Sequence, residues 1–195
     1  MNHRVKNLFA VASGMVTMTA RSATSVQAMS EALRGRLIAL AKAHELVRPA
    51  IKRDVEVSPA ASLRSLIEAV ITPHIDPNNA HQVDFDGPDL ELGTNASTSL
   101  ALIFHELATN AAKYGALTSP EGHFSVKWGV VNEHLELEWT EHVFQREISS
   151  PDKSGFGSTL AHASASGQLG GSISFDWRPS GLHIKLNVPL GRLAR

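Results

Sequence analysis

The stretch His105-Glu-Leu-Ala-Thr-Asn-Ala-Ala-Lys-Tyr-Gly115 decides the fold expected for this chain. An apolar run precedes it, so residues 95–115 are predicted to form a buried amphipathic helix that ends at the glycine, as a C′ residue would end it. Glu106, Asn110 and Lys113 lie at i, i+4 and i+7, on one stripe of that helix. A carboxylate, a carboxamide and an ammonium side by side suit a magnesium-bound polyphosphate. An ordinary helix with a solvated polar edge explains these three residues equally well when they are taken alone.

The first residues of the chain carry a second polar stripe, in Met1-Asn-His-Arg-Val-Lys-Asn7. Apolar side chains recur after it at helical spacing, so residues 2–21 are predicted to form a helix. His3 and Asn7 share one face of this helix at i and i+4, with Lys6 close by. Taken alone, His3 is explained by an ordinary solvated histidine on a helix surface.

Together, these strings resemble the HWE-type sensor histidine kinases of two-component systems. The resemblance covers essentially the whole chain and rests on five motifs in order: His3-Arg-Val-Lys-Asn7, Arg36-Leu-Ile-Ala-Leu-Ala-Lys-Ala-His44, the stretch at 105–115, Trp139-Thr-Glu141 and Gly155-Phe-Gly-Ser158. It implies an α+β fold. A helical hairpin for dimerisation and histidine phosphotransfer, residues 1–50, is followed by a GHKL-type catalytic ATP-binding sandwich with a mixed sheet, residues 51–195.

The resemblance also implies an enzyme, a protein-histidine kinase. It would use ATP and Mg²⁺ to phosphorylate itself on His3, and would pass the phosphoryl group to an aspartate in the receiver domain of a response regulator. Imidazole suits this role because much of it is a neutral nucleophile at pH 7. A homodimer is a possible further partnership. In the family an upstream sensor domain leads into the histidine, and it is absent from this chain, which starts two residues before His3.

The resemblance assigns catalytic roles to His3, Arg4, Lys6, Asn7 and Glu106. Arg4 follows the histidine where other histidine kinases have an acid, so the general base is unassigned. Arg4 and Lys6 can hold the incoming phosphate, and Asn7 can orient the imidazole or a water.

The nucleotide site implied by the resemblance is centred on the 105–115 stretch. Asn110 matches the family's magnesium-linked asparagine, and Glu106 can bind magnesium through water or hold its helix in place. For His105, phosphate contact and simple packing are both open. Lys113 and Tyr114 would contact phosphate and ribose, although Tyr114 also fits a core position.

Two later motifs complete the expected cofactor-binding set. Glu141 aligns with the carboxylate that reads the adenine amino group. Gly155, Phe156 and Gly157 form the glycine box, whose backbone N–H groups can cradle phosphates at the start of a helix predicted over residues 158–169. Without the other motifs, a plain turn into that helix explains the box.

One segment departs from the family. Val143-Phe-Gln145 stands where a Gly-Gly-Pro is expected, and the larger side chains should crowd the nucleotide pocket. This supports an alternative function, a phosphotransfer or scaffold module with a degenerate nucleotide site that binds a response regulator without being an active kinase. A GHKL ATPase or anti-sigma-type kinase is a third possibility, and His3-Arg-Val-Lys-Asn7 argues against it.

Composition narrows the function classes. The 195-residue chain has a net charge of -1, so no basic field argues for nucleic acid. It has no cysteine, which excludes disulfides and fits a cytoplasmic protein. No apolar run approaches the ~20 residues of a membrane span. Ten histidines are scattered without the spacing of a zinc site.

The remaining elements are predicted from periodicity and turn signals. Ser30 is expected to cap a helix that ends near Val47, and Ser58 to cap another with Pro59 at its first position. The two N-terminal helices should pair with a second copy into a four-helix bundle or fold back on the rest of the chain. Strands are predicted over residues 54–57, 81–85, 90–92, 124–130, 135–139, 172–177 and 182–188.

Overall fold

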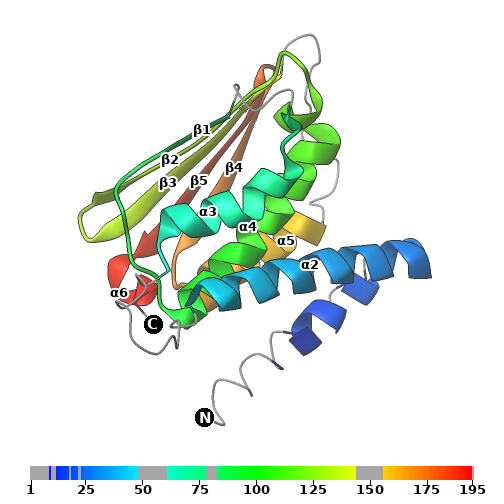
Figure 1. Ribbon diagram of the computed structural model, residues 1–195, viewed down its shortest axis with the longest axis horizontal. Coiled ribbons are helices and arrows are strands. Elements are labelled where there is room, and N and C mark those ends of the chain that lie inside the picture. Colours follow the sequence, from blue (N-terminus) through cyan, green and yellow to red (C-terminus); the bar gives the residue numbers. More distant parts are fainter. Residues whose placement is uncertain are drawn as a thin grey trace, which may run out of the picture.

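The computed structural model describes residues 9, 12–17, 19–21, 23–47, 61–77, 83–143 and 156–194 (Figure 1). A five-stranded sheet is covered on one face by helices, and a long helix, α2 (Val26–Val47), packs against those helices rather than against the sheet. The predicted boundary between two domains at residue 50 lies outside the described residues and stays a prediction. Within the described residues, no helix combines the length and the apolar character needed to cross a membrane.

The sheet has the strand order β1-β2-β3-β5-β4. β1 runs parallel to β2, and every other neighbouring pair is antiparallel, so the predicted mixed sheet is confirmed. The strands are β1 (Val83–Asp86), β2 (His123–Val131), β3 (His134–His142), β4 (Ser172–Arg178) and β5 (Gly181–Pro189). The strands predicted over 124–130 and 135–139 pair as one hairpin, and those over 172–177 and 182–188 pair as another. The predicted strand at 90–92 is reduced to one bridge between Ser62 and Glu91. The predicted strand at 54–57 lies outside the described residues.

Side chains alternate across the sheet as the period-2 patterns predict. On β3, Leu137 and Trp139 are buried towards the helices, whereas Glu136 and Glu138 face solvent. Glu138 pairs there with Lys185 of β5, at 3.3 Å. This leaves one apolar face, which packs against the helices, and one charged face.

Helix α4 (Thr94–Tyr114) lies across the middle of the apolar face and matches the predicted 95–115 helix closely. Its C-cap, Gly115, has φ -113°, so it is not the left-handed residue that the sequence predicts. Glycine is needed there for space instead, because a Cβ would collide with the carboxylate of Glu141. This close approach fixes the end of α4 against β3.

Helix α3 (Leu63–Ile71) flanks α4, and its start corrects the sequence prediction. Ser62 is the N-cap, with Ala61 outside the helix, so Ser58 does not cap it. The Ser65 backbone N–H donates to Ser62 Oγ, and the Ser62 backbone N–H donates to Ser65 Oγ, both at 3.2 Å. This reciprocal pair satisfies two N–H groups that the helix leaves free.

Helix α2 (Val26–Val47) begins four residues before the predicted cap at Ser30 and ends where predicted. It packs along α4 and touches α3, so it folds back on its own chain, one of the two arrangements predicted. Leu40 of α2, Met15 and Leu102 of α4 form a small apolar cluster. Residues 12–17 and 19–21 are also helical, inside the helix predicted over residues 2–21. The other helices of the described residues are the 3₁₀ turns η1 (Thr72–His74) and η3 (Ala116–Thr118), α5 (Phe156–Ala163) with its π-helical continuation η4 (Ser164–Gln168), and α6 (Leu190–Leu193). The sequence did not predict α6.

Candidate nucleotide and phosphotransfer site

Two of the predicted motifs meet where α5 packs against α4. A Cβ built on Gly157 would lie 3.0 Å from Glu106 Oε2 and 3.3 Å from Asn110 Nδ2. Both distances are tighter than ordinary van der Waals contact, so the glycine allows the α5 backbone to approach these side chains closely. The glycine box and the 105–115 stretch, predicted to act together, are therefore adjacent in space.

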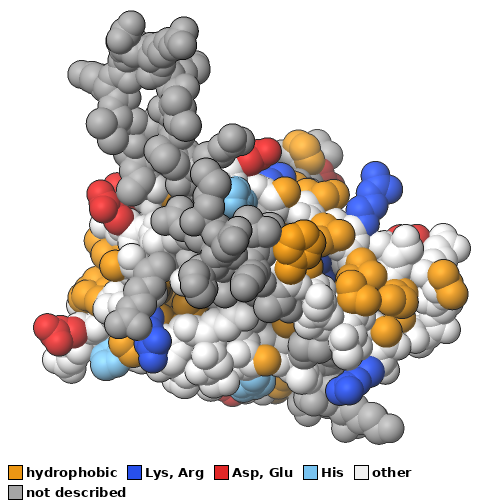
Figure 2. All heavy atoms as spheres, turned by 90° about the horizontal axis from the view of Figure 1, so that it is seen from below, with side chains coloured by type: hydrophobic (Ala, Val, Ile, Leu, Met, Phe, Trp, Pro, Cys, Tyr) orange, Lys and Arg blue, Asp and Glu red, His pale blue; other side chains and the backbone are white. Residues whose placement is uncertain are grey.

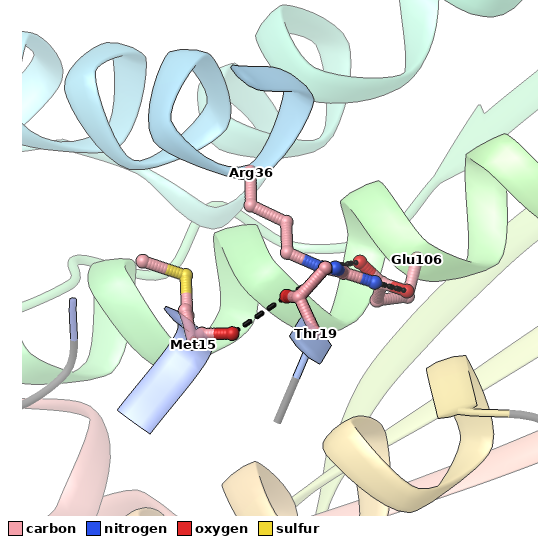
Figure 3. A network of polar contacts seen from close by, with 4 residues as sticks. All are labelled: Met15, Thr19, Arg36 and Glu106. Carbon is pink, nitrogen blue, oxygen red and sulfur yellow. Dashed lines mark hydrogen bonds and ion pairs between the residues drawn. The ribbon is translucent and has the colours of Figure 1, made fainter. Parts of the chain in front are cut away.

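Glu106 is held by a network of buried polar contacts (Figure 3). Arg36 Nε lies 2.6 Å from Glu106 Oε1, and Arg36 Nη2 donates to Glu106 Oε2 at 2.9 Å. Arg36 Nη1 donates to the Thr19 hydroxyl at 2.8 Å, and that hydroxyl donates to the Met15 carbonyl at 2.6 Å. Of the two roles predicted for Glu106, holding its helix in place is the one seen; a magnesium role stays a prediction.

His105, next along α4, faces α2. A Cβ on Gly35 would lie 2.8 Å from His105 Nε2, and the ring of His74 lies 5.5 Å away, centroid to centroid. Burial lowers the pKa of His105 to about 4, despite the opposing effect of the Glu106 carboxylate. Burial, followed by Lys42, also lowers the pKa of His74. His105 is therefore a neutral packing residue at neutral pH, and phosphate contact stays a prediction.

Asn110, Lys113 and Tyr114 lie exposed at the C-terminal end of α4. Tyr114 is 63% exposed, which excludes the core position that the sequence left open. All three side chains are accessible to a ligand. No cluster of three or more histidine and acidic side chains that could hold a metal occurs in the described part of the chain. A metal would therefore depend on Asn110, on Glu106 if it became free, and on oxygens of the ligand.

Glu141 is buried at the end of β3, with 3% exposure, and its two oxygens have partners from its own chain. Trp139 Nε1 donates to Oε1 at 2.9 Å, and the Ala116 backbone N–H donates to Oε2 at 3.1 Å. Burial raises the pKa of Glu141, and these two hydrogen bonds oppose the shift. Trp139 is a fully buried core residue. Adenine recognition by Glu141 stays a prediction.

Val143, expected to crowd the nucleotide pocket, is 8% exposed and belongs to the main apolar core. Its backbone N–H donates to the Ser180 carbonyl at 2.9 Å. Several predicted site residues lie outside the described residues: His3, Arg4, Lys6, Asn7, Phe144 and Gly155. Of Phe156, only its place as the first residue of α5 is described.

Sequence reasoning missed the role of Arg36 and of Thr19. In the motif over residues 36–44, Arg36 is simply the first residue. Its position carries a signal, because it lies three residues after Leu33 and four before Leu40, on the apolar stripe of the helix. A single arginine on such a stripe predicts a buried acidic partner.

The chain is similar in sequence and in fold to known histidine kinases. The model of the family described as HWE histidine kinase matches residues 1–89. Residues 1–89 are therefore similar to the HWE histidine kinases. A relative named blue-light-activated histidine kinase 1, from Erythrobacter litoralis (strain HTCC2594), is 33% identical over 193 residues, which are 97% of this chain and 52% of the relative. A blue-light-activated histidine kinase from Brucella anthropi is 29% identical, over 97% of this chain and 38% of its own.

The chain spans about half the length of the first of these relatives, and less of the second. Its fold is that of solved histidine kinase domains. The blue-light activated histidine kinase EL346 of Erythrobacter litoralis superposes with a TM-score of 0.71 at 14% identity, covering 97% of this chain and 60% of that one. The histidine kinase domain of the same protein gives a TM-score of 0.64 at 14% identity, covering 95% and 96%.

Proposed function

We propose that the chain is an ATP-dependent protein-histidine kinase that phosphorylates itself on His3 and passes the phosphoryl group to a response-regulator aspartate. The observation that carries the proposal is the close approach of Gly157 to Asn110 and Glu106. It brings a loop-to-helix backbone, a carboxamide and an acid to one place, as a metal-bound nucleotide would require. The family match over residues 1–89, which include His3, supports the same function.

In this proposal, each described residue of the site has a limited role. The exposed amide oxygen of Asn110 contributes a magnesium ligand, and Lys113 contributes positive charge to the phosphates. Backbone N–H groups at the start of α5 hold the phosphates, where the helix dipole favours negative charge. Bound Mg²⁺ and ATP supply the transferable γ-phosphoryl group and part of the charge neutralisation that phosphoryl transfer needs.

The proposed reaction is a displacement at phosphorus. A neutral imidazole nitrogen of His3 attacks the γ-phosphorus, the bond to the β,γ-bridging oxygen breaks, and ADP leaves with the bonding electrons. The proton of the imidazole passes to solvent or to a base that is not identified. The phosphoryl group then moves from the histidine to a receiver carboxylate.

We place the protein partners on the N-terminal helices. Apolar side chains are exposed there, and hydrophobic side chains also gather on the face viewed in Figure 2, towards which α2 lies. Among the residues described before α3, the large exposed apolar ones are Phe9, Val16, Val26, Leu37 and Ile38. A receiver domain or a second copy of this chain would bury them on binding. A cytoplasmic location is part of the same proposal.

A second candidate function, a phosphotransfer or scaffold module that lacks kinase activity, is favoured by one observation. The carboxylates of Glu106 and Glu141 are both engaged by their own chain. Nucleotide binding distinguishes the two functions, because a scaffold module needs none.

The test is calorimetric titration with ADP, with and without Mg²⁺. We expect magnesium-dependent binding by the wild-type chain and at least a tenfold weaker affinity for Asn110→Ala. Asn95→Ala, on an exposed residue of the same helix, is the matched control and should bind as the wild type does. Circular dichroism should show all three chains equally folded. No binding by the wild type, or equal binding by Asn110→Ala, would contradict the proposed nucleotide site.

A further inference from the structure

Arg36 connects three parts of the molecule through one side chain. It belongs to α2, its Nη1 reaches Thr19, and its Nε and Nη2 reach the two oxygens of Glu106 on α4. The side chains of Arg36 and Glu106 are only 6% and 9% exposed. We call the contacts among these three residues the Arg36 clasp (Figure 3).

The clasp occupies an apolar surface of α2. Ala39, Leu40 and Ala43 of the same helix are buried against the rest of the chain. A buried ion pair adds little stability compared with apolar side chains of similar volume, because both charges must leave water. Stability alone therefore gives no reason for an arginine here. What the pair does provide is a defined partner for one carboxylate.

That carboxylate belongs to the candidate nucleotide site. The Oε2 atom that accepts from Arg36 Nη2 is the same atom that would lie 3.0 Å from a Cβ on Gly157. Arg36 occupies one acceptor site on each oxygen from the α2 side, places a positive charge beside them, and leaves the Glu106 side chain only 9% exposed, so the closed contact disfavours a cation at Glu106. Cation binding to Glu106 and the complete clasp therefore oppose one another.

We propose that the Arg36 clasp is a regulatory contact: closed, it docks α2 on α4 and withholds Glu106 from a magnesium nucleotide. Opening it frees the carboxylate and releases α2. This inference rests on the proposed function, because it assumes that the nucleotide binds beside Asn110 and Gly157. Linkage then makes the effect reciprocal: whatever pulls α2 away strengthens nucleotide binding, and bound nucleotide weakens the docking of α2.

The experiment has a structural arm and a binding arm. The chain has no cysteine, so Ile38→Cys on α2 and Glu136→Cys on β3, both at exposed positions, can be spin-labelled as the only thiols. The distance between the labels reports the docking of α2. Magnesium-dependent affinity for ADP is measured on the same proteins without labels.

The variants are Arg36→Gln, which removes the charge, and Arg36→Lys, which keeps it but lacks the two-pronged guanidinium. Arg34→Gln, on an exposed residue of the same helix, is the matched control. We expect both Arg36 variants to broaden or shift the label distance and to bind Mg·ADP at least threefold more tightly. Arg34→Gln should change neither. In a Glu106→Gln background, Arg36→Gln should no longer affect the affinity.

The outcomes separate this inference from the proposed function. An unchanged label distance in both Arg36 variants, or equal or weaker Mg·ADP affinity, would overturn the clasp while nucleotide binding itself stands. If Arg36→Gln unfolds, Arg36→Lys decides. If neither the wild type nor any variant binds ADP, the proposed function is wrong. The proposal that the clasp withholds Glu106 is then wrong as well.

Discussion

Two acidic side chains of the described residues, Glu106 and Glu141, are buried, and each has its own hydrogen-bond partners. Glu106 faces a guanidinium, whereas Glu141 accepts hydrogen bonds only from an indole and a backbone N–H. A charge that is buried away from water needs such partners. A charged partner and neutral donors have different effects on the buried carboxylate. The arginine preserves a full opposite charge beside Glu106. Burial raises the pKa of Glu141 by more than its two neutral donors lower it, so its ionisation opposes folding.

The lowered pKa of His105 predicts acid sensitivity. The pKa falls from 6.5 to about 4 on folding, so between these values the unfolded chain binds a proton that the folded chain does not. The free energy of unfolding should therefore decrease as the pH falls from 6.5 to 4, by at most about 3 kcal/mol from this residue. Urea titrations at several pH values measure it.

His105→Gln should flatten this pH dependence, although His74 contributes in the same direction and a part will remain. His142→Gln, on an exposed residue of β3, is the control and should keep the wild-type profile. Identical profiles for His105→Gln and the wild type would show that His105 is solvated rather than buried.

Gly115 tests the contact between the end of α4 and Glu141. Gly115→Ala places a Cβ against the Glu141 carboxylate and 2.9 Å from Ala111 Cα, so we expect a loss of about 1–3 kcal/mol of folding free energy. Gly129→Ala on β2 has no atom within 4 Å of the new Cβ and is the matched control. Guanidinium denaturation compares the two, and equal midpoints would contradict the close packing.

At the scale of elements, α4 organises the molecule. It contacts the helices α2, α3 and α5, and it carries the candidate nucleotide residues at its C-terminal half. Its buried residues, Leu100 and Phe104 among them, fill the core below the sheet. Because α2 packs on this helix, any movement of α2 acts directly on the element that holds Asn110.

The docking of α2 predicts which of its leucines matters. Leu40 is 5% exposed in the cluster with Met15 and Leu102, so Leu40→Ala should lower the free energy of unfolding by about 2–4 kcal/mol. Leu37, one turn earlier, is 49% exposed, and Leu37→Ala should change it by less than about 0.5 kcal/mol. Thermal denaturation of both variants measures this difference. Equal losses would mean that α2 is not docked as described.

At the scale of the whole molecule, local sequence patterns predicted the positions of single helices, strands and turns. The helical period of α4 and the alternation in β2 and β3 located those elements within one to three residues. The hairpin turn at Asn132 and Glu133 lies between the strands predicted over 124–130 and 135–139, and both residues have positive φ. Gly157 of the glycine box lies beside Glu106 and Asn110, as a single nucleotide site formed by both motifs would require.

What the sequence missed depends on contacts between distant residues. Ser58 and Ser62 carry the same local cap signal, and the choice of Ser62 accompanies backbone pairing with the segment around Leu90 and Glu91. Gly115 is small because Glu141 lies beside it, 26 residues later in the chain. The Arg36 contact with Glu106 spans 70 residues. No periodicity within a single element encodes such pairs.

The most direct test of the central claim is phosphorylation of His3. The chain is incubated with γ-³²P-labelled ATP and Mg²⁺, and the label is tested for loss in acid and retention in alkali. The account predicts acid-labile, alkali-stable label on the wild type and on the His123→Gln control, an exposed histidine of β2, and none on His3→Gln, which should still bind ADP. Label that persists on His3→Gln, or a wild-type chain that binds nucleotide and is never labelled, would contradict it.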